Sequence, residues 1–424
     1  MEESRYNFWS TTPDGAHLLF NGRTGALIEF EAHELEMVTD ALAGAPGPWT
    51  DVMASSGFVV DDTGAEQESL VERLLQGSGP SPILELTIAP TYACNFRCDY
   101  CYVHFEDRRM DRDAAERILK YVDEHLPQHA QANITWFGGE PLLQWRLVAE
   151  MAAQLTQIGA KHRRPLLQFL TTNGYLLTSE VTQSLVDAGI IYFHITIDGA
   201  DAGQNQRRVL RDGRPTYQRV LENLTVLLEQ HPEARVTLRM NLEPDSVALA
   251  RPLLQAISPS LRNRIQVHAT PVIRAGVVRD PQLHREIADV ISTALELGYV
   301  YYDNAIPVGR ASHCTAESST TFQVGPGGEL HKCSPSGKPE VTVGSLNQAG
   351  LPVLRAEATE VWEGVGLPQE CVDCQYLCCC GGGCRLTRLR EQSAPSCADP
   401  YVAMESLVRN LWMARTRAMA HFAS

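Results

Sequence analysis

The sequence predicts an α/β fold built around a parallel sheet with helical crossovers. Between residues 83 and 298, six strand-like segments are each followed by a helical one. The pairs are 83–90 with 111–126, 132–137 with 145–162, 166–174 with 179–189, 192–199 with 217–231, 235–242 with 248–257, and 264–272 with 283–298. This alternation is typical of parallel strands joined by right-handed crossovers. Six units form either an open doubly wound sheet or a partial barrel. We expect a partial (β/α)6 TIM-like barrel, with its active site at the carboxyl ends of the strands.

Smaller units flank the repeat. Short strand-like and helical segments up to about residue 76 predict a small N-terminal α+β domain, and a second helix near 48–56 is poorly marked. A Gly- and Pro-rich stretch at 77–82 predicts a linker. Beyond about residue 303, Gly, Pro and Cys become frequent and helical periodicity is lost until 400–422. We therefore expect domains at 1–80, 83–302 and 303–400, with a C-terminal amphipathic helix at 401–424 that docks on the body.

The net charge of the chain argues against two classes of binding partner. The 424 residues carry a formal net charge of −15, and so acidic a surface repels phosphate backbones and anionic lipids. We expect neither nucleic acid nor a membrane as a partner, and a basic peptide fits the charge better. The first residues lack the positive charge and apolar run of a secretion signal, and no apolar stretch is long enough to span a bilayer. The expected location is cytoplasmic.

The 12 cysteines fall into two groups, three between Cys94 and Cys101 and nine between Cys314 and Cys397. In a reducing compartment, clustered cysteines indicate metal ligands rather than disulfides. The first group, Cys94-x3-Cys98-x2-Cys101, directly follows the first predicted strand. Three thiolates at this spacing can hold one face of a cubane iron–sulfur cluster and leave one iron open to a small molecule. The alternative is a zinc knuckle, with His104 as the fourth ligand.

These cysteines, with Tyr100 before the third, resemble the CxxxCxxC motif of the radical S-adenosylmethionine (SAM) superfamily, and the resemblance covers roughly residues 83–300. The second strand ends in Gly138-Gly139-Glu140-Pro141, which is similar to the family's GGEP motif. The resemblance implies a [4Fe-4S] cluster, and it implies that GGEP binds the amino group of SAM. It also implies one-electron cleavage of SAM to a 5′-deoxyadenosyl radical, which abstracts hydrogen from the substrate.

Two further stretches match the family's sequence pattern less exactly. ITIDG followed by QNQRR is similar to the family's S-x-D-G…H-D-x-x-R stretch, although Thr196, Gln204 and Asn205 stand where Ser, His and Asp are usual. On this alignment Arg208 would meet the cofactor carboxylate, and Thr172 and Asn173, with Gly174, would line the pocket. The alternative is a plain surface arginine, since Arg207 and Arg211 are equally basic neighbours.

The C-terminal cysteines resemble the seven-cysteine SPASM signature, in which Gly328 also has its expected place. The resemblance implies two auxiliary [4Fe-4S] clusters and thus three in total. Their implied ligands are Cys314, Cys333 and Cys384 for the first, and Cys371, Cys374, Cys380 and Cys397 for the second. The first cluster then lacks a fourth ligand. Either Cys378 or Cys379 closes it, or its iron stays open to substrate. The alternative for the whole array is a zinc ribbon.

Radical SAM enzymes with SPASM domains mostly modify peptides or proteins. We therefore expect hydrogen abstraction from a ribosomally synthesised precursor peptide, giving a thioether, a carbon–carbon crosslink, an epimer or a backbone excision. The N-terminal unit loosely resembles a winged-helix-like leader-recognition element, which binds by strand addition; the alternative is a structural cap for the barrel. An electron donor such as flavodoxin or ferredoxin is implied. The sequence leaves open an accessory protein, and it marks no catalytic acid or base.

Three alternatives to this function stand. The chain could mature a folded protein, as sulfatase maturases do, or act on a small peptide-derived cofactor. Sulfatase maturases carry an acidic residue at the position of Ser334, which favours the precursor-peptide interpretation. A zinc-bound scaffold without enzymatic activity is the third alternative, and it would contain no iron or sulfide.

Overall fold

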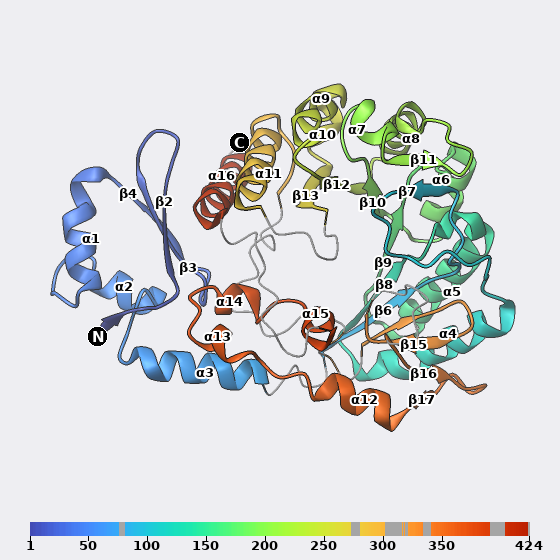
Figure 1. Ribbon diagram of the computed structural model, residues 1–424, viewed down its shortest axis with the longest axis horizontal. Coiled ribbons are helices and arrows are strands. Elements are labelled where there is room, and N and C mark those ends of the chain that lie inside the picture. Colours follow the sequence, from blue (N-terminus) through green and yellow to red (C-terminus); the bar gives the residue numbers. More distant parts are fainter. Residues whose placement is uncertain are drawn as a thin grey trace.

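The computed structural model describes residues 1–75, 81–272, 280–301, 316, 318, 321–333, 341–390 and 403–422. Its largest feature is a curved sheet with helices along the outer side (Figure 1). No helix within these ranges is both long and apolar enough to cross a membrane. The predicted linker at 77–82 falls largely outside the described residues.

The sheet contains the six predicted parallel strands, each followed by its helix. In chain order the strands are β6 (Ile83–Ile88), β8 (Gln131–Trp136), β9 (Leu166–Thr172), β10 (Tyr192–Thr196), β12 (Arg235–Leu242) and β13 (Ile265–Pro271). The helices that follow them are α4 (Arg112–His125), α5 (Trp145–His162), α6 (Ser179–Asp187), α8 (Tyr217–Gln230), α9 (Ala250–Ala256) and α11 (Pro281–Glu296).

The order of the strands decides between the two predicted topologies. Their order across the sheet follows their order along the chain, and every neighbouring pair is parallel. With no reversal of direction, right-handed crossovers place all the helices on one face. The sheet is therefore a partial barrel and not a doubly wound sheet, and it does not close on itself.

The two faces of the sheet differ in burial. Along β12, Val236, Leu238, Met240 and Leu242 are buried on the helix side, whereas the alternate residues Thr237, Arg239 and Asn241 are only partly buried. The same alternation appears in β6, β8 and β10. Because successive side chains point to opposite faces, the inner face of the barrel presents a polar surface.

The C-terminal region extends this sheet and contains helices that the sequence did not predict. β14 (Phe322–Val324) pairs in parallel with β6, and β15 (Glu329–His331), β16 (Thr342–Leu346) and β17 (Pro352–Leu354) continue antiparallel. Four short helices follow: α12 (Ala356–Glu363), α13 (Gln369–Val372), α14 (Leu377–Cys380) and α15 (Arg385–Arg390). The sequence shows no helical periodicity here, because helices of one or two turns are too short to display one.

The N-terminal unit is a three-stranded antiparallel sheet with helices. It contains β2 (Asn7–Thr11), β3 (His17–Asn21), β4 (Leu27–Phe30), α1 (Leu35–Leu42) and α2 (Thr50–Ser56), and a small ribbon of β1 (Glu2–Glu3) with β5 (Val59–Val60). The sequence missed α3 (Thr63–Leu75), which begins where Asp62 accepts hydrogen bonds from the backbone N–H groups of Gly64 and Ala65.

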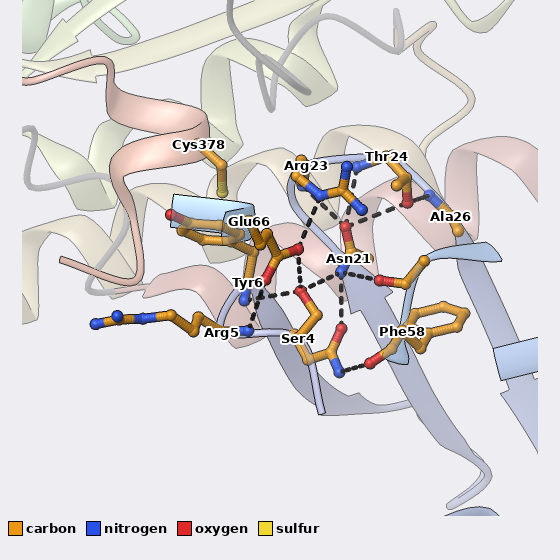
Figure 2. Close-up of polar contacts among 12 residues, drawn as sticks. Ser4, Arg5, Tyr6, Asn21, Arg23, Thr24, Ala26, Phe58, Glu66 and Cys378 are labelled. Carbon is orange, nitrogen blue, oxygen red and sulfur yellow. Dashed lines mark hydrogen bonds and ion pairs between the residues drawn. The ribbon is translucent and has the colours of Figure 1, made fainter. Parts of the chain in front are cut away.

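A buried carboxylate ties α3 to the N-terminal strands (Figure 2). Glu66 accepts hydrogen bonds from Ser4 Oγ at 2.8 Å and from Arg23 Nε at 2.8 Å. Asn21 donates to Ser4 Oγ and to the Gly57 carbonyl. Because one partner of Glu66 is cationic and the other donors are satisfied, the network compensates for burying this charge.

The C-terminal helix α16 (Met404–Phe422) joins the barrel to the N-terminal unit. Asn410 accepts a hydrogen bond from Ser292 Oγ of α11 at 2.6 Å and donates to the Ala288 carbonyl of the same helix at 3.0 Å. On its other side, Arg409 donates to the Thr11 carbonyl and Trp412 Nε1 donates to Glu29. The helix α16 is thus hydrogen-bonded both to α11 of the barrel and to the N-terminal unit (Figure 1).

Candidate active site

The first cysteine group lies where the fold predicts an active site, directly after β6. Cys98 ends the short strand β7 (Phe96–Cys98), and the backbone N–H of Phe96 donates to Cys94 Sγ at 3.3 Å. Burial, together with the nearby Glu140, Cys98 and Cys101, raises the pKa of Cys94 to about 12. Three partly buried thiols in one loop resist ionisation on their own. They suit a metal group that binds thiolates and stabilises their charge.

The cysteine loop does not form a site for a single metal ion. Within the described part of the chain, no three Cys, His, Asp or Glu side chains converge as one metal ion requires. A cubane spreads its thiolate ligands over a larger volume than one ion does. That such a cluster binds Cys94, Cys98 and Cys101 stays a prediction from the sequence.

The glycine turn after β8 packs against the cysteine loop. The backbone N–H of Gly139 donates to the Thr91 carbonyl at 2.9 Å, and that of Glu140 donates to the Ala93 carbonyl at 2.8 Å. A Cβ atom at Gly138 would lie 2.4 Å from the Thr91 carbonyl oxygen, and one at Gly139 would lie 2.2 Å from that of Ala93. No side chain fits at these distances, so both glycines permit close approach of the loop that carries the cysteines.

Glu140 is fully buried and organises the ends of two strands. Its carboxylate accepts hydrogen bonds from Thr172 Oγ1 at 2.7 Å, from the Asn173 backbone N–H at 2.8 Å and from the Leu142 N–H at 3.0 Å. Burial raises the pKa of Glu140. A carboxylate offers about four acceptor positions, so these three bonds leave room for one further donor. Pro141 follows it at the start of a short 3-10 helix.

A second buried cluster lies beside Cys98. β11 (Arg208–Leu210) pairs with β7, and Arg208 lies opposite Cys98. Arg208 donates through NH1 to Tyr100 Oη at 2.7 Å, and Tyr100 Oη bonds to Asp198. Arg208 is only 6% exposed, so the alternative of a plain surface arginine does not hold. Arg207, by contrast, forms ion pairs with acidic residues after β12, and Arg211 is exposed.

Two buried donors in this region lack a hydrogen-bond partner among the described residues. They are Arg208 Nε and Asn95 Nδ2. The nearest carboxylate oxygen to Arg208 Nε belongs to Asp198 at 3.9 Å, which is too far for a hydrogen bond. Asn95 is held by Asn173, whose Nδ2 donates to Asn95 Oδ1 at 2.8 Å. Unsatisfied buried donors are rare in folded proteins, and these fit a ligand that carries a carboxylate and other acceptors.

Asp198 and Asn241 belong to this cluster although sequence reasoning did not single them out. Asp198 is fully buried, and its Oδ1 accepts from the backbone N–H of Asn241 at 2.8 Å. Asn241 Nδ2 also lies 3.2 Å from Tyr100 Oη. Asp198 lies just after β10 and Asn241 lies near the end of β12, and this position at the carboxyl ends of parallel strands is the signal in the sequence that could have marked them.

The departures from the family's pattern have structural roles here. Gln204 is fully buried, accepts from the Asp198 backbone N–H at 3.0 Å and donates to Thr216 Oγ1 at 3.1 Å. Asn205 Oδ1 accepts from the N–H groups of Thr216 and Tyr217. These two side chains hold the loop that positions Asp198.

The C-terminal cysteines occupy two kinds of environment. Cys378 and Cys379 are fully buried in a core shared by β2, β3, α14 and α16. A Cβ atom at Gly22 would lie 2.8 Å from Cys378 Sγ and 2.9 Å from Cys379 Sγ. Figure 2 shows Cys378 beside the ring of Tyr6. The two thiols therefore pack against the N-terminal unit.

The other C-terminal cysteines in the described ranges are more accessible. Cys333, Cys371, Cys374 and Cys380 are partly exposed, and Cys384 is exposed. Between the last two, Gly381, Gly382 and Gly383 have φ angles of +61°, +81° and +80°. Three left-handed residues in succession give the sharp turn expected there. Cys314, Cys397 and Ser334 lie outside the described residues.

Comparison with known proteins agrees with this site. Residues 88–245 match the model of the radical SAM superfamily. A serine-type anaerobic sulfatase-maturating enzyme of Klebsiella aerogenes is 24% identical over 328 residues, which is 72% of this chain and 80% of that protein. The PqqA peptide cyclase of Bradyrhizobium diazoefficiens is 24% identical over 344 residues, which is 76% of this chain and 87% of that protein.

Two solved structures share the fold. The structure of anSMEcpe with bound AdoMet and Cp18Cys peptide has a TM-score of 0.60 and 18% identity, over 80% of this chain and 98% of that one. The structure of Streptococcus suis SuiB bound to S-adenosylmethionine has a TM-score of 0.53 and 15% identity, over 93% and 97%. The match to the family model includes the three cysteines, the glycine turn and Arg208, so residues 88–245 of this chain are similar to a radical SAM domain.

Proposed function

We propose that this chain is a radical SAM enzyme with a SPASM domain that modifies a residue of a ribosomally synthesised precursor peptide. The observation that carries the proposal is the buried Arg208, which lies opposite Cys98 with an unsatisfied Nε. A buried guanidinium beside three thiols suits the carboxylate of a SAM molecule bound at the cluster.

The names of the relatives support a peptide or protein substrate. They include a sulfatase-maturating enzyme, a PqqA peptide cyclase, and SuiB in a structure bound to the precursor peptide SuiA. Maturation of a folded sulfatase is the second candidate, because the sulfatase-maturating relative matches over a similar length.

In the proposed mechanism the chain binds and orients SAM. Cys94, Cys98 and Cys101 would hold a [4Fe-4S] cluster, Arg208 the SAM carboxylate, and the turn of Gly138, Glu140 and their neighbours the SAM ammonium. The chemistry that the bound cofactors supply is one-electron cleavage of the sulfonium, giving a 5′-deoxyadenosyl radical that takes a hydrogen atom from the substrate. Thr172 and Asn173 fix the Glu140 carboxylate, so its remaining acceptor position has a set direction.

Two auxiliary clusters complete the proposal. The burial of Cys378 and Cys379 against Gly22 supports the version in which neither thiol closes the first auxiliary site. That cluster would then keep an iron open to the substrate. A flavodoxin- or ferredoxin-type donor would supply the electrons.

The first test is metal content and SAM cleavage after anaerobic reconstitution. Three four-iron clusters correspond to about 12 irons, and a Cys94/Cys98/Cys101→Ala variant should retain about 8. The variant should form no 5′-deoxyadenosine. A wild-type protein that binds zinc and no sulfide would overturn the proposal.

The second test measures whether Arg208 binds SAM, independently of the reaction. Arg208→Lys should weaken equilibrium binding of SAM by roughly tenfold, because lysine cannot form the bidentate contact. Arg211→Lys changes an exposed neighbour in the same way and should leave SAM binding unchanged. Equal affinities for the two variants would remove Arg208 from the site.

The substrate class is tested by co-expression. The enzyme is produced with each short open reading frame that flanks its gene, and each peptide is analysed by mass spectrometry. Loss of two hydrogen atoms from one peptide indicates a thioether or crosslink. Oxidation of a sulfatase active-site peptide, with no change in any flanking peptide, would support the sulfatase candidate instead.

A further inference from the structure

Three basic side chains share the inner face of the barrel below the candidate active site. They are His194 of β10, Arg239 of β12 and His268 of β13. Arg239 lies directly opposite His268 in the parallel pair, and His194 lies opposite Thr237, two residues before Arg239.

The histidines are held in their neutral form. Burial and the Arg239 charge lower the pKa of His194, and burial, Arg239 and His194 lower the pKa of His268 to about 4. Each neutral imidazole can still donate one N–H. The group as a whole therefore presents one permanent positive charge and two neutral donors.

Arg239 forms no ion pair in the part of the chain that the structure describes, and the Asp198 carboxylate acts on it only from a greater distance. Its Nε donates to Asn241 Oδ1 at 3.1 Å, and its NH2 donates to Thr270 Oγ1 at 3.0 Å. Both acceptors are uncharged. The carboxylate of Asp198 is already bound by Tyr100 and Asn241. A partly buried guanidinium without a counter-charge is costly, and such groups cluster at functional sites.

The three side chains lie next to the place proposed for SAM. Asn241, which accepts from Arg239, also bonds to Asp198 and Tyr100 of the cofactor cluster. Arg239 is two residues further from the end of the strand than Asn241, a distance of roughly 7 Å along a strand. A group held by Arg239 would thus sit one layer below the cofactor, on the inner face of the barrel.

We propose that Arg239, with His194 and His268 beside it, forms a binding site for a carboxylate of the peptide substrate. The planar guanidinium matches a carboxylate in geometry and charge, and the two imidazoles supply further donors. The carboxylate is either an acidic side chain close to the modified residue or the C-terminus of the peptide. This inference rests on the proposed function and adds the chemical class of its substrate.

The experiment measures peptide binding to the reconstituted enzyme with SAM, by isothermal titration calorimetry. The probes are three pentapeptides: acetyl-Gly-Gly-Glu-Gly-Gly-amide, the same peptide with Gln for Glu, and acetyl-pentaglycine with a free C-terminus. The variants are Arg239→Gln and, as a matched control, Arg235→Gln. Arg235 also lies on the inner face of β12 but bonds to backbone carbonyls at the amino end of the strand. Both variants lose one positive charge.

We expect the wild type to bind one of the carboxylate peptides about tenfold more tightly than the Gln peptide. Arg239→Gln should abolish this preference, and Arg235→Gln should retain it. Preference for the Glu peptide assigns the site to an acidic side chain, and preference for the free C-terminus assigns it to the peptide end. His268→Asn, which keeps Arg239, should reduce the preference in part.

Equal binding of all three peptides, or a preference that survives in Arg239→Gln, would overturn the inference. Formation of 5′-deoxyadenosine is measured in the same samples. If SAM is cleaved but no carboxylate preference exists, only the carboxylate site fails. If the wild type cleaves no SAM, the proposed function itself fails.

Discussion

The residues of the candidate active site are linked by two chains of hydrogen bonds. Arg208, Tyr100 and Asp198 form one buried chain of hydrogen bonds, and Glu140 forms another with Thr172. Both chains adjoin the cysteine loop. Because each side chain already has its neighbours in place, the site is preorganised for a ligand that supplies the missing acceptors.

Gly139 offers the sharpest test at this scale. In Gly139→Ala the new methyl group would meet the Ala93 carbonyl oxygen, so the cysteine loop must move. We expect the free energy of unfolding to fall by about 1–3 kcal/mol and the first cluster to be lost. Iron content and thermal denaturation measure these effects. Gly47→Ala, whose Cβ would meet nothing within 4 Å, should leave both unchanged.

At the scale of elements, α16 packs between α11 and β2 and contacts both. Its contact with α11 depends on Asn410, which is fully buried and bonded to both Ser292 and Ala288. The contact with β2 combines the hydrogen bond from Arg409 to the Thr11 carbonyl with a shared apolar core, in which Leu407 and Leu411 lie with Phe8.

Asn410→Leu should reduce the free energy of unfolding by about 1–3 kcal/mol, because it removes the two buried hydrogen bonds that Asn410 forms with α11. Denaturant unfolding measures the change. Thr416→Ala, at an exposed position of the same helix, should have little effect. A similar loss in both variants would mean that the buried contact of Asn410 does not determine the effect, since both substitutions raise helix propensity.

For the whole molecule, the thiols of Cys378 and Cys379 connect the cysteine-rich region to the N-terminal sheet. A Cys378/Cys379→Ala variant should keep about 12 irons after reconstitution, whereas Cys384→Ala should lose about four. Loss of iron from the Cys378/Cys379 variant would show that one of these thiols does ligate a cluster. Its thermal stability should fall only modestly, because removing each sulfur leaves a small cavity.

The barrel could be predicted from the sequence because the patterns that indicate its strands and helices are local. Each strand and helix of the six units has its own periodicity, and each motif residue follows a strand. It missed α3, whose surface is strongly charged, and α12 to α15, which are one or two turns long. Asp198 and Asn241 were missed because they come from different strands and meet only in the fold. The burial of Cys378 depends on Gly22, more than 350 residues away, and no pattern predicts such a contact.

The core that holds Cys378 and Cys379 also contains Tyr6 and Phe8 from the first strands and Leu407 and Leu411 from the last helix. It cannot assemble until Leu411 has left the ribosome, which happens well after the six strands of the barrel have emerged. We therefore expect the N-terminal unit to take its final position later than the barrel folds. Until then the C-terminal cysteines lie outside a finished core, which gives the iron–sulfur assembly machinery of the cell an interval in which to load them.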